Sequence, residues 1–362
     1  MTLPFGPPVA PMLAKAAKEL PRGPGLSYEP KWDGFRCIVF RDGPETVLTS
    51  RNERELTRYF PELVAGLEAH LPPAVVLDGE VVIAGPDGLD FDALLNRIHP
   101  AQSRVIRLAA ETPASYVAFD LLALGTDDLR RRGFEERRRA LEGLFAAPSG
   151  SVHLTPATGD PALAAQWFDR FEGAGLDGVV AKHGDEAYAE GRRVMVKVKH
   201  ERTADCVVGG YRRHKSGEGV GSLLLGLYDQ GGVLHHVGVT SSFSLVQRRE
   251  LVATLAPYAE PSLDAHPWAG PVGDSGQRRP GGESRWNAGR DLSFEALRPE
   301  LVCEVAYDHL QTGRFRHTAA FRRWRPDRKP ASCTYEQLET VVPTELRTVL
   351  AASAPARGES AG

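Results

Sequence analysis

The chain has 362 residues, more than one ordinary hydrophobic core occupies, so two domains are expected. Its composition, 42% apolar and 25% charged, is typical of a soluble globular protein, and no apolar run is long enough to cross a membrane. The net charge of −3 excludes a broadly basic surface, so any contact with nucleic acid must use a local basic patch.

The N-terminus and the cysteines exclude further classes of protein. The chain begins MTLPFGPPVAPML, with neither a basic start nor a continuous apolar stretch, so we expect no export signal, no membrane partner and a cytoplasmic location. The four cysteines are far apart and form no Cys-x-x-Cys pair, which predicts neither a zinc site nor a disulfide framework. Basic stretches such as Arg314–Lys329 are usually solvated charged faces and do not by themselves indicate DNA binding.

Residues 1–201 are predicted to form an α/β or α+β domain, because short β-branched runs alternate with helical patterns. Strands are expected at Cys37–Arg41, Val75–Ile83, Tyr116–Leu122, Gly178–Lys182 and Val194–Lys199. Apolar residues at spacings of three and four predict helices at Phe60–Leu71, Phe134–Phe145 and Ala162–Ala174.

Residues 202–351 have a different pattern: strand-like runs are separated by glycine-rich turns, and one helical pattern lies at Ser244–Tyr258. The expected strands are Cys206–Tyr211, Ser222–Tyr228, Val233–Val239 and Leu301–Tyr307. This pattern predicts a small β-barrel domain. Residues 261–289 are rich in Pro and Gly, which predicts a long mobile loop that buries little, and residues 352–362 are expected to be a disordered tail.

One segment of the first domain combines a lysine with a tight turn. It reads Glu29-Pro-Lys31-Trp-Asp33-Gly34-Phe-Arg36 and leads straight into a predicted strand. Because Asp-Gly is a common hairpin turn, one interpretation is a surface hairpin with an exposed lysine. The other is a nucleophile: a lysine that attacks phosphorus must be neutral, which requires a lowered pKa, and a carboxylate such as Asp33 can orient its amine.

The Lys-x-Asp-Gly-x-Arg form of this segment resembles the first motif of the nucleotidyltransferase superfamily of ATP-dependent DNA ligases, RNA ligases and mRNA-capping enzymes. Later segments resemble that family's further motifs, in the family's order: Ser50-Arg51-Asn52, Leu77–Val81, Tyr116–Asp120, Asp177–Lys182 and Val196–Lys199. So many elements in order are far less expected by chance than any single short motif. The resemblance implies a nucleotidyltransferase (adenylation) domain followed by an oligonucleotide-binding (OB-fold) barrel, with AMP carried covalently on Lys31.

The resemblance also implies how the nucleotide is bound. Glu29 would accept a hydrogen bond from the adenine amino group, and Phe119 would stack on the purine. Arg36 and Glu80 would contact the ribose, and Arg51 would bind phosphate oxygens. Taken alone, Phe119 is better explained as an ordinary core aromatic in an apolar strand.

Three lysines are expected to bring positive charge to the same site. Lys197 and Lys199 alternate along one strand, so both should point to one face, and Lys182 lies on the preceding strand. Together they would neutralise the triphosphate and disfavour protonation of Lys31. A solvated strand face carrying two lysines is the alternative reading of that strand.

A divalent metal, Mg²⁺ or Mn²⁺, is implied as a second cofactor beside ATP, with Glu80 and Asp177 as its ligands. The family usually has glutamate where this chain has Asp177. An aspartate can still bind a divalent cation through oxygen, directly or through water.

In the second domain, the segment ending Arg325-Pro-Asp327-Arg328 resembles the family's last motif, of the form Arg-x-Asp-Lys, with Arg328 in place of lysine. The resemblance implies that Arg325 and Asp327 act on the departing pyrophosphate when the barrel closes over ATP. A hinge is expected near residues 201–205. Arg328 could equally contact DNA or serve the fold.

The whole pattern most resembles stand-alone bacterial repair ligases of the ligase C type. The implied substrate is nicked duplex DNA, with other repair proteins as possible partners and a monomer as the expected state. An RNA ligase or a GTP-dependent capping enzyme is the enzymatic alternative, because these share the same covalent chemistry. A non-catalytic nucleic-acid-binding scaffold is the alternative of a different class.

Overall fold

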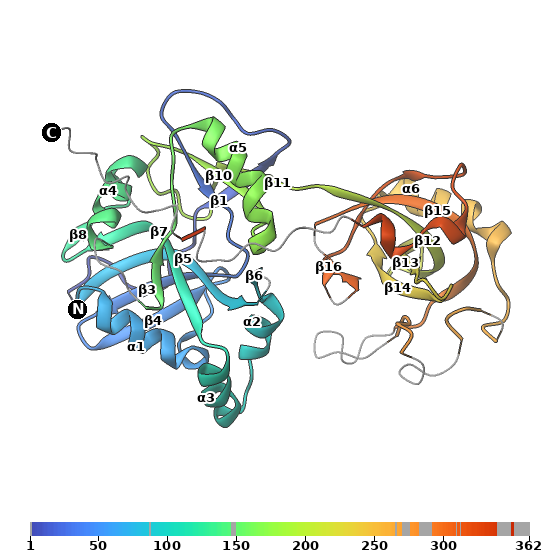
Figure 1. Cartoon of the computed structure of the whole chain (residues 1–362), viewed down its shortest axis with the longest axis horizontal. Coiled ribbons are helices and arrows are strands. Elements are labelled where there is room, and N and C mark those ends of the chain that lie inside the picture. The colour runs from blue at the N-terminus through green and yellow to red at the C-terminus, as the bar shows by residue number, and fades with distance from the viewer. Residues whose placement is uncertain are drawn as a thin grey trace. The chain divides into compact units, whose positions relative to one another are not determined.

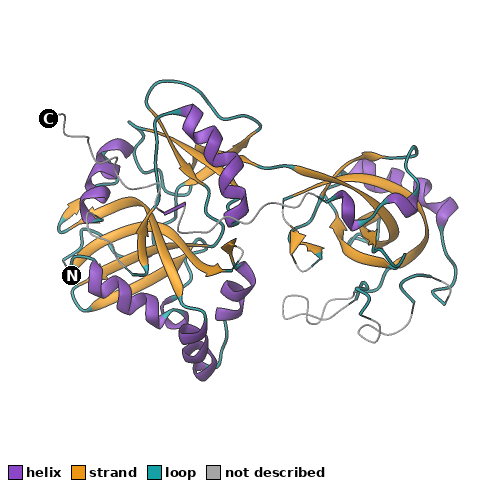
Figure 2. Cartoon of the chain, viewed as in Figure 1, coloured by secondary structure: helices purple, strands orange, loops and turns teal. Residues whose placement is uncertain are grey.

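The computed structural model describes residues 2–86, 88–145, 150–264, 266–269, 276–281, 292–308, 310–311, 313–338 and 349–350. The chain forms two compact units, Met1–Lys199 with Val341–Gly362 and His200–Thr340. Figures 1 and 2 show a mixed α/β unit and a unit built mainly of strands, which are described separately.

The predicted second domain extended to residue 351, and this boundary is wrong. Val349 is fully buried in a cluster with Trp32 and Val82 of the first unit, because that cluster accepts its apolar side chain. The expected tail, residues 352–362, lies outside the described residues.

A seven-stranded sheet is the centre of the first unit. Its main path runs β4-β3-β5-β7-β8, with β6 beside β5 and β9 beside β7. The strands are β3 (Phe35–Asp42), β4 (Glu45–Ser50), β5 (Ala74–Gly85), β6 (Gly88–Leu89), β7 (Ala114–Leu124), β8 (Asp127–Asp128) and β9 (Val152–Leu154). The three longest are those that the β-branched runs predicted.

Helices cover one face of this sheet (Figure 1). They are α1 (Pro61–His70), α2 (Phe91–Arg97), α3 (Gln102–Glu111) and α4 (Phe134–Leu144), and the short turn η1 (Thr57–Tyr59) leads into α1. Leu63 and Leu67 of α1, Leu94 of α2 and Leu141 of α4 are buried against odd-numbered residues of β3 and β5. The sequence predicted α1 and α4, and it missed α2 and α3.

A second sheet packs on the other face of the first. Its order is β1-β11-β10-β2, from β1 (Leu13–Ala17), β2 (Leu26–Pro30), β10 (Gly178–His183) and β11 (Arg193–Lys199). Ile38 of β3, Val76 of β5 and Met195 of β11 share one buried cluster, so the two sheets meet through their inner faces. Helix α5 (Pro161–Arg170), followed by η2 (Phe171–Ala174), covers the outer side of β2 and β10.

The second unit is a closed barrel. Its sheet order is β14-β13-β12-β15-β18, and a parallel bridge between Thr240 and Ala319 joins the last residue of β14 to the start of β18. The strands are β12 (Arg202–Arg213), β13 (Val220–Tyr228), β14 (Leu234–Thr240), β15 (Glu295–Tyr307) and β18 (Ala320–Trp324), with the small pair β16 (Leu310–Gln311) and β17 (Arg314–Phe315). Helix α6 (Leu245–Leu255) and the turns η3 (Ala256–Tyr258), η4 (Pro330–Ser332) and η5 (Tyr335–Gln337) complete it.

The prediction that residues 261–289 bury little is wrong for their described part. The Trp268 side chain is only 3% exposed and lies in the barrel core. Its indole fits over Gly209 and Gly226, where any larger side chain would clash with it, and its Nε1 donates to the Leu234 carbonyl at 3.0 Å. Trp268, together with buried His266, thus attaches this part of the Pro/Gly-rich segment to the core.

Candidate active site

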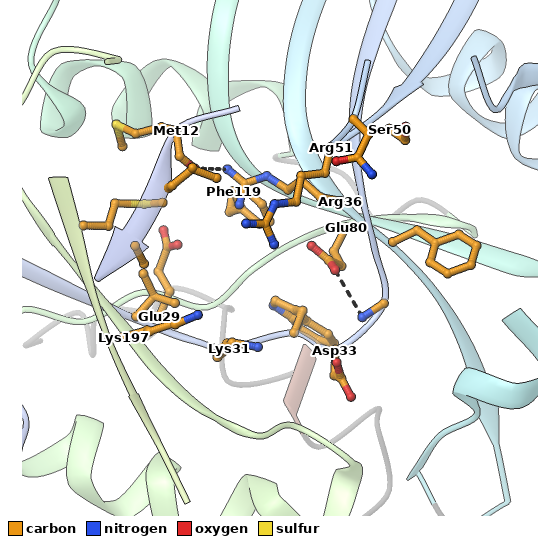
Figure 3. Close-up of a pocket in the computed structure, with 18 of the residues that line it drawn as sticks. Met12, Glu29, Lys31, Asp33, Arg36, Ser50, Arg51, Glu80, Phe119 and Lys197 are labelled. Atoms are coloured by element: carbon orange, nitrogen blue, oxygen red, sulfur yellow. Dashed lines mark hydrogen bonds between the residues drawn. The ribbon is translucent and has the colours of Figure 1, made fainter. Parts of the chain in front are cut away.

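The main pocket of the first unit opens between the inner faces of its two sheets and has a volume of about 840 Å³ (Figure 3). Side chains alternate across a strand, so even-numbered residues of β3 and β5 face the second sheet. Arg36 and Glu80 are cross-strand partners on this face, and both line the pocket, as does Phe119 of β7. One alternation pattern thus brings three predicted residues to one site.

The second sheet contributes a row of side chains to the opposite wall. Glu29 on β2 pairs with Val180 on β10, which pairs with Lys197 on β11, which pairs with Ala16 on β1. All four line the pocket. Lys199 also lines it, which confirms that Lys197 and Lys199 share one face of their strand.

Lys31 follows directly after β2 and is held in place by backbone hydrogen bonds at the end of the sheet. Its backbone N–H donates to the Gly178 carbonyl at 2.8 Å. Gly178 has φ +151°, and a Cβ there would lie 1.9 Å from the Val198 carbonyl oxygen, so only glycine fits. This close approach explains why glycine follows Asp177 in the motif.

Asp177 bridges two lysines. One of its oxygens lies 2.6 Å from Lys31 Nζ, and the other lies 2.6 Å from Lys199 Nζ. The three side chains are 17% to 33% exposed, so water screens these pairs only in part. Burial raises the pKa of Asp177, but the two ammonium groups outweigh it and hold the pKa below its ordinary value.

The expectation that clustered cations lower the pKa of Lys31 is wrong for this arrangement. Burial does lower it, but the charge of Asp177, the hydrogen bond that Asp177 accepts, and the charges of Asp33 and Glu80 reverse the effect. The pKa of Lys31 is therefore raised, and the amine is protonated while Asp177 holds it. The neighbouring lysine shows the predicted lowering instead: burial and the positive charges of Lys199 and Lys31 lower the pKa of Lys197.

Glu80 lies beside the turn that follows Lys31 (Figure 3). Its Oε1 accepts a hydrogen bond from the Gly34 backbone N–H at 3.1 Å. A Cβ at Gly34 would lie 2.2 Å from the Val81 carbonyl oxygen, so this glycine is needed for the turn to reach β5. Burial raises the pKa of Glu80 to about 7, although Arg36 and Lys31 oppose it. Asp33 lies in the same turn and adds negative charge near both groups.

Arg36 is held by a residue that the sequence did not single out. Asp78 is fully buried and accepts from Arg36 at 2.6 and 2.7 Å, and its second oxygen also accepts from the Tyr188 hydroxyl at 2.5 Å. The Arg36 guanidinium lies 4.4 Å from the centre of the Phe119 ring. The motif around Glu80 thus supplies Asp78 as an anchor for Arg36.

Glu29 lines the pocket, but its ion-pair partners leave little of it exposed. It is 2% exposed, with one oxygen 2.7 Å from Lys182 Nζ and the other 3.5 Å from Arg138. Lys182 is 3% exposed and also donates to the Phe119 carbonyl at 3.0 Å. Arg138, on α4, is a further residue that the motifs did not indicate.

The predicted metal ligands, Glu80 and Asp177, both lie near Lys31, and oxygen donors of this kind suit Mg²⁺ or Mn²⁺. Within the described ranges, no group of three or more His, Cys, Asp or Glu residues could hold a metal ion. Glu80 and Asp177 would supply one or two oxygens to such a cation, and substrate phosphates and water would complete its shell.

The predicted residues of the second unit lie together at the end of β18. Arg325 binds Asp327 through its Nε and one terminal nitrogen, at 3.0 and 2.8 Å. Its other terminal nitrogen binds Asp205 of β12 at 2.9 and 3.0 Å. Arg325 holds the pKa of Asp327 down at about 2. Arg328 Nε lies 3.0 Å from Asp205, a residue that sequence reasoning placed only in the hinge.

Comparisons with known proteins identify the family. Residues 11–199 match the family described as ATP dependent DNA ligase domain, and residues 216–328 match the ATP dependent DNA ligase C terminal region. The chain belongs to the ATP-dependent DNA ligases. It is 56% identical over 357 residues to DNA ligase C of Mycobacterium tuberculosis, covering 97% of this chain and 99% of that protein. It is 50% identical over 360 residues to DNA ligase C1 of Mycolicibacterium smegmatis, with the same coverage.

A solved structure of a Lig E DNA ligase matches 88% of this chain and 100% of its own, with a TM-score of 0.54. At 19% identity this likeness shows the fold alone. The predicted fold class and the resemblance to ATP-dependent DNA ligases of the ligase C type are confirmed. None of the described helices has the length and apolar character needed to cross a membrane.

Proposed function

We propose that this ATP-dependent DNA ligase seals nicks through an AMP carried on Lys31. The observation that carries the proposal is the Lys31–Asp177–Lys199 bridge, whose two lysines line the same pocket as the family's other motif residues. Lys31 Nζ attacks the α-phosphorus of ATP and pyrophosphate leaves. The AMP then passes to the 5′-phosphate of the nick, and the 3′-hydroxyl displaces it to form the phosphodiester.

The pocket residues have distinct parts in binding the nucleotide. Phe119 stacks on the purine and Glu29 accepts from the adenine amino group. Arg36, held by Asp78, and Glu80 contact the ribose. Because Arg36 and Glu80 are cross-strand partners, the two ribose contacts are fixed by one register of the sheet.

Cations that line the pocket bind the triphosphate. Lys182 is the exception, since Glu29 neutralises it in a buried pair. Arg51, Lys197 and Lys199 line the pocket and supply the phosphate contacts.

Asp177 controls the protonation of Lys31. While Asp177 accepts from Lys31, the amine is protonated and unreactive. When phosphate competes for Lys199 and Asp177 moves away, burial and the neighbouring cations favour loss of the proton from Lys31. Glu80 and Asp177 would hold a divalent metal, which would supply positive charge to the phosphates.

In the barrel, Arg325 and Asp327 orient the departing pyrophosphate, and Arg328 carries the charge that the family's lysine supplies. The substrate is nicked duplex DNA, and the similarity to DNA ligase C supports a role in bacterial repair. We further propose a monomer that acts in the cytoplasm, where bacterial DNA lies, and that meets other repair proteins there.

The test is self-adenylation. Purified protein is first treated with pyrophosphate and freed of it, then incubated with α-labelled ATP or GTP and a divalent metal, and run on a denaturing gel. We expect label from ATP only, on the peptide that contains Lys31, and none in Lys31→Ala. The variant should unfold at nearly the wild-type temperature, because one partly exposed pocket lysine adds little stability.

Lys215→Ala is the matched control, since it removes an exposed lysine outside the pocket. Label that persists in Lys31→Ala would refute the nucleophile. Label from GTP alone would make the chain a capping-type enzyme, and no label would make it a binding protein. Sealing of nicked RNA but not nicked DNA would exclude the DNA substrate.

A further inference from the structure

The guanidinium of Arg325 is bound by two carboxylates that differ in their surroundings. Asp327 binds the Nε edge and is 61% exposed, so solvent weakens that pair and another anion can replace it. Asp205 binds the opposite terminal nitrogen through both oxygens, and its side chain is 11% exposed. The two ends of Arg325 are therefore unequal, with one exchangeable contact and one enclosed contact.

Asp205 is itself fixed in the barrel wall. Its backbone N–H donates to Gln337 Oε1 at 2.8 Å, and its carbonyl accepts from Gln337 Nε2 at 3.1 Å. It also lies opposite Glu304 in the central β12–β15 pairing. Because these contacts fix the backbone of Asp205, its carboxylate can orient the guanidinium of the arginine that it binds.

The same carboxylate lies beside the chain's departure from the family motif. Arg328 Nε is 3.0 Å from Asp205, whereas Glu304 is 3.7 Å from Arg325 and 2.7 Å from Arg323. Asp205 is thus shared by the two arginines of the last motif, and Glu304 mainly serves Arg323.

We propose that Asp205 is the positioning residue for the last motif: it holds one end of Arg325 while the Nε edge exchanges Asp327 for the departing pyrophosphate. This inference rests on the proposed function, because it assumes that Arg325 acts on pyrophosphate. Asp205 touches no substrate, and its effect passes through Arg325. Only the step that releases pyrophosphate depends on it.

The test separates the steps of the reaction. In Asp205→Asn, the rate of self-adenylation at saturating ATP should fall about tenfold or more, as expected when a charged group loses a hydrogen-bonded partner. The KM for ATP should change much less, because the contact matters most as charge develops on the leaving group. Sealing of a nick that already carries AMP on its 5′-phosphate should stay within about twofold of wild type, since no pyrophosphate leaves in that step.

Glu295→Gln is the matched control, because it removes one carboxylate from the paired strand where the contact is with Arg213, and it should leave adenylation near the wild-type rate. A double-variant cycle with Arg325→Ala gives the decisive measurement: once Arg325 is absent, Asp205→Asn should have no further effect on adenylation.

The outcomes distinguish the two proposals. A wild-type protein that takes no label from ATP would refute the proposed function. A labelled wild type with an Asp205→Asn variant that adenylates equally fast would refute the positioning role alone. Equal losses in adenylation and in sealing of pre-adenylated DNA, or an unchanged effect of Asp205→Asn in the Arg325→Ala background, would also refute it, because a purely structural role produces that result.

Discussion

The Asp177→Asn variant tests whether one carboxylate sets the protonation of the nucleophile. Asp177 lies 2.6 Å from the Nζ atoms of both Lys31 and Lys199, and its charge raises the pKa of Lys31 against the effect of burial. Losing a hydrogen bond to a charged group costs about 1.5–3 kcal/mol, and in Asp177→Asn this loss falls on the protonated form of Lys31. The pKa of Lys31 should fall, because burial still disfavours the charged amine and only the weaker effects of Asp33 and Glu80 then oppose it.

Competitive labelling measures this shift directly. Protein without nucleotide is labelled with trace acetic anhydride from about pH 6 to about pH 11, a range that includes the ordinary lysine pKa, and each lysine is quantified by mass spectrometry. The midpoint for Lys31 should move to lower pH in Asp177→Asn, while exposed Lys215 serves as the internal reference. Asp185→Asn is the matched control, since that side chain is 86% exposed.

Self-adenylation of Asp177→Asn should fall although its amine is more reactive, because Asp177 is also a proposed metal ligand. An unchanged Lys31 profile would show that Asp177 does not control the nucleophile. A shift that appears equally in Asp185→Asn would attribute the effect to net charge rather than to the contact.

Three further predictions concern the pH dependence of stability, the packing of the barrel core and the salt dependence of nick sealing. The folded pKa of Glu80, about 7, exceeds its ordinary 4.5, so wild type should lose stability relative to Glu80→Gln as pH rises from 4.5 through 7. The change should reach about 2–3 kcal/mol in denaturant unfolding, and a difference independent of pH would contradict the raised pKa. Trp268→Ala should lower the unfolding free energy of the barrel by about 3–5 kcal/mol, whereas Leu263→Ala, at an exposed position of the same segment, should cost far less. A small loss for Trp268→Ala would mean that the segment does not pack. Nick sealing should weaken steeply between about 50 mM and 200 mM salt, because phosphate contacts release counterions, and flat activity over that range would argue against a DNA substrate.

The strands of the first unit were predictable because a buried strand is marked by apolar, β-branched residues that follow one another in the sequence. β-Branched runs at β3, β5 and β7 marked the central sheet, and the two-residue period then placed Arg36 and Glu80 on one face. Lys197 and Lys199 followed the same rule. Helix α2 was missed because its seven residues are too short to show a helical period. Helix α3 does carry that period, with Val105 and Ala109 buried four residues apart, so the sequence contained the signal for it and the prediction overlooked it.

The partners of the site residues were not predictable, because they come from distant parts of the chain. Asp78 and Tyr188 are 110 residues apart, and Asp205 and Arg325 are 120 apart. Nothing in the spacing of either pair connects them. The sign of the Lys31 pKa shift was wrong for a related reason: the motifs gave the number of cations, and only the fold places Asp177 between two of them.

The ion pairs of the pocket suggest an order of events when ATP enters. Asp177 pairs with both Lys31 and Lys199, Glu29 pairs with Lys182 and Asp78 pairs with Arg36. Of these contacts, those of Glu29 and Asp78 are buried and costly to break, whereas the Asp177 bridge is partly open to water. Phosphate should therefore displace Asp177 first and leave the base and ribose contacts in place. The carboxylate that keeps Lys31 protonated is thus also the one that the substrate displaces most readily, so the nucleophile loses its proton only when there is a phosphorus to attack.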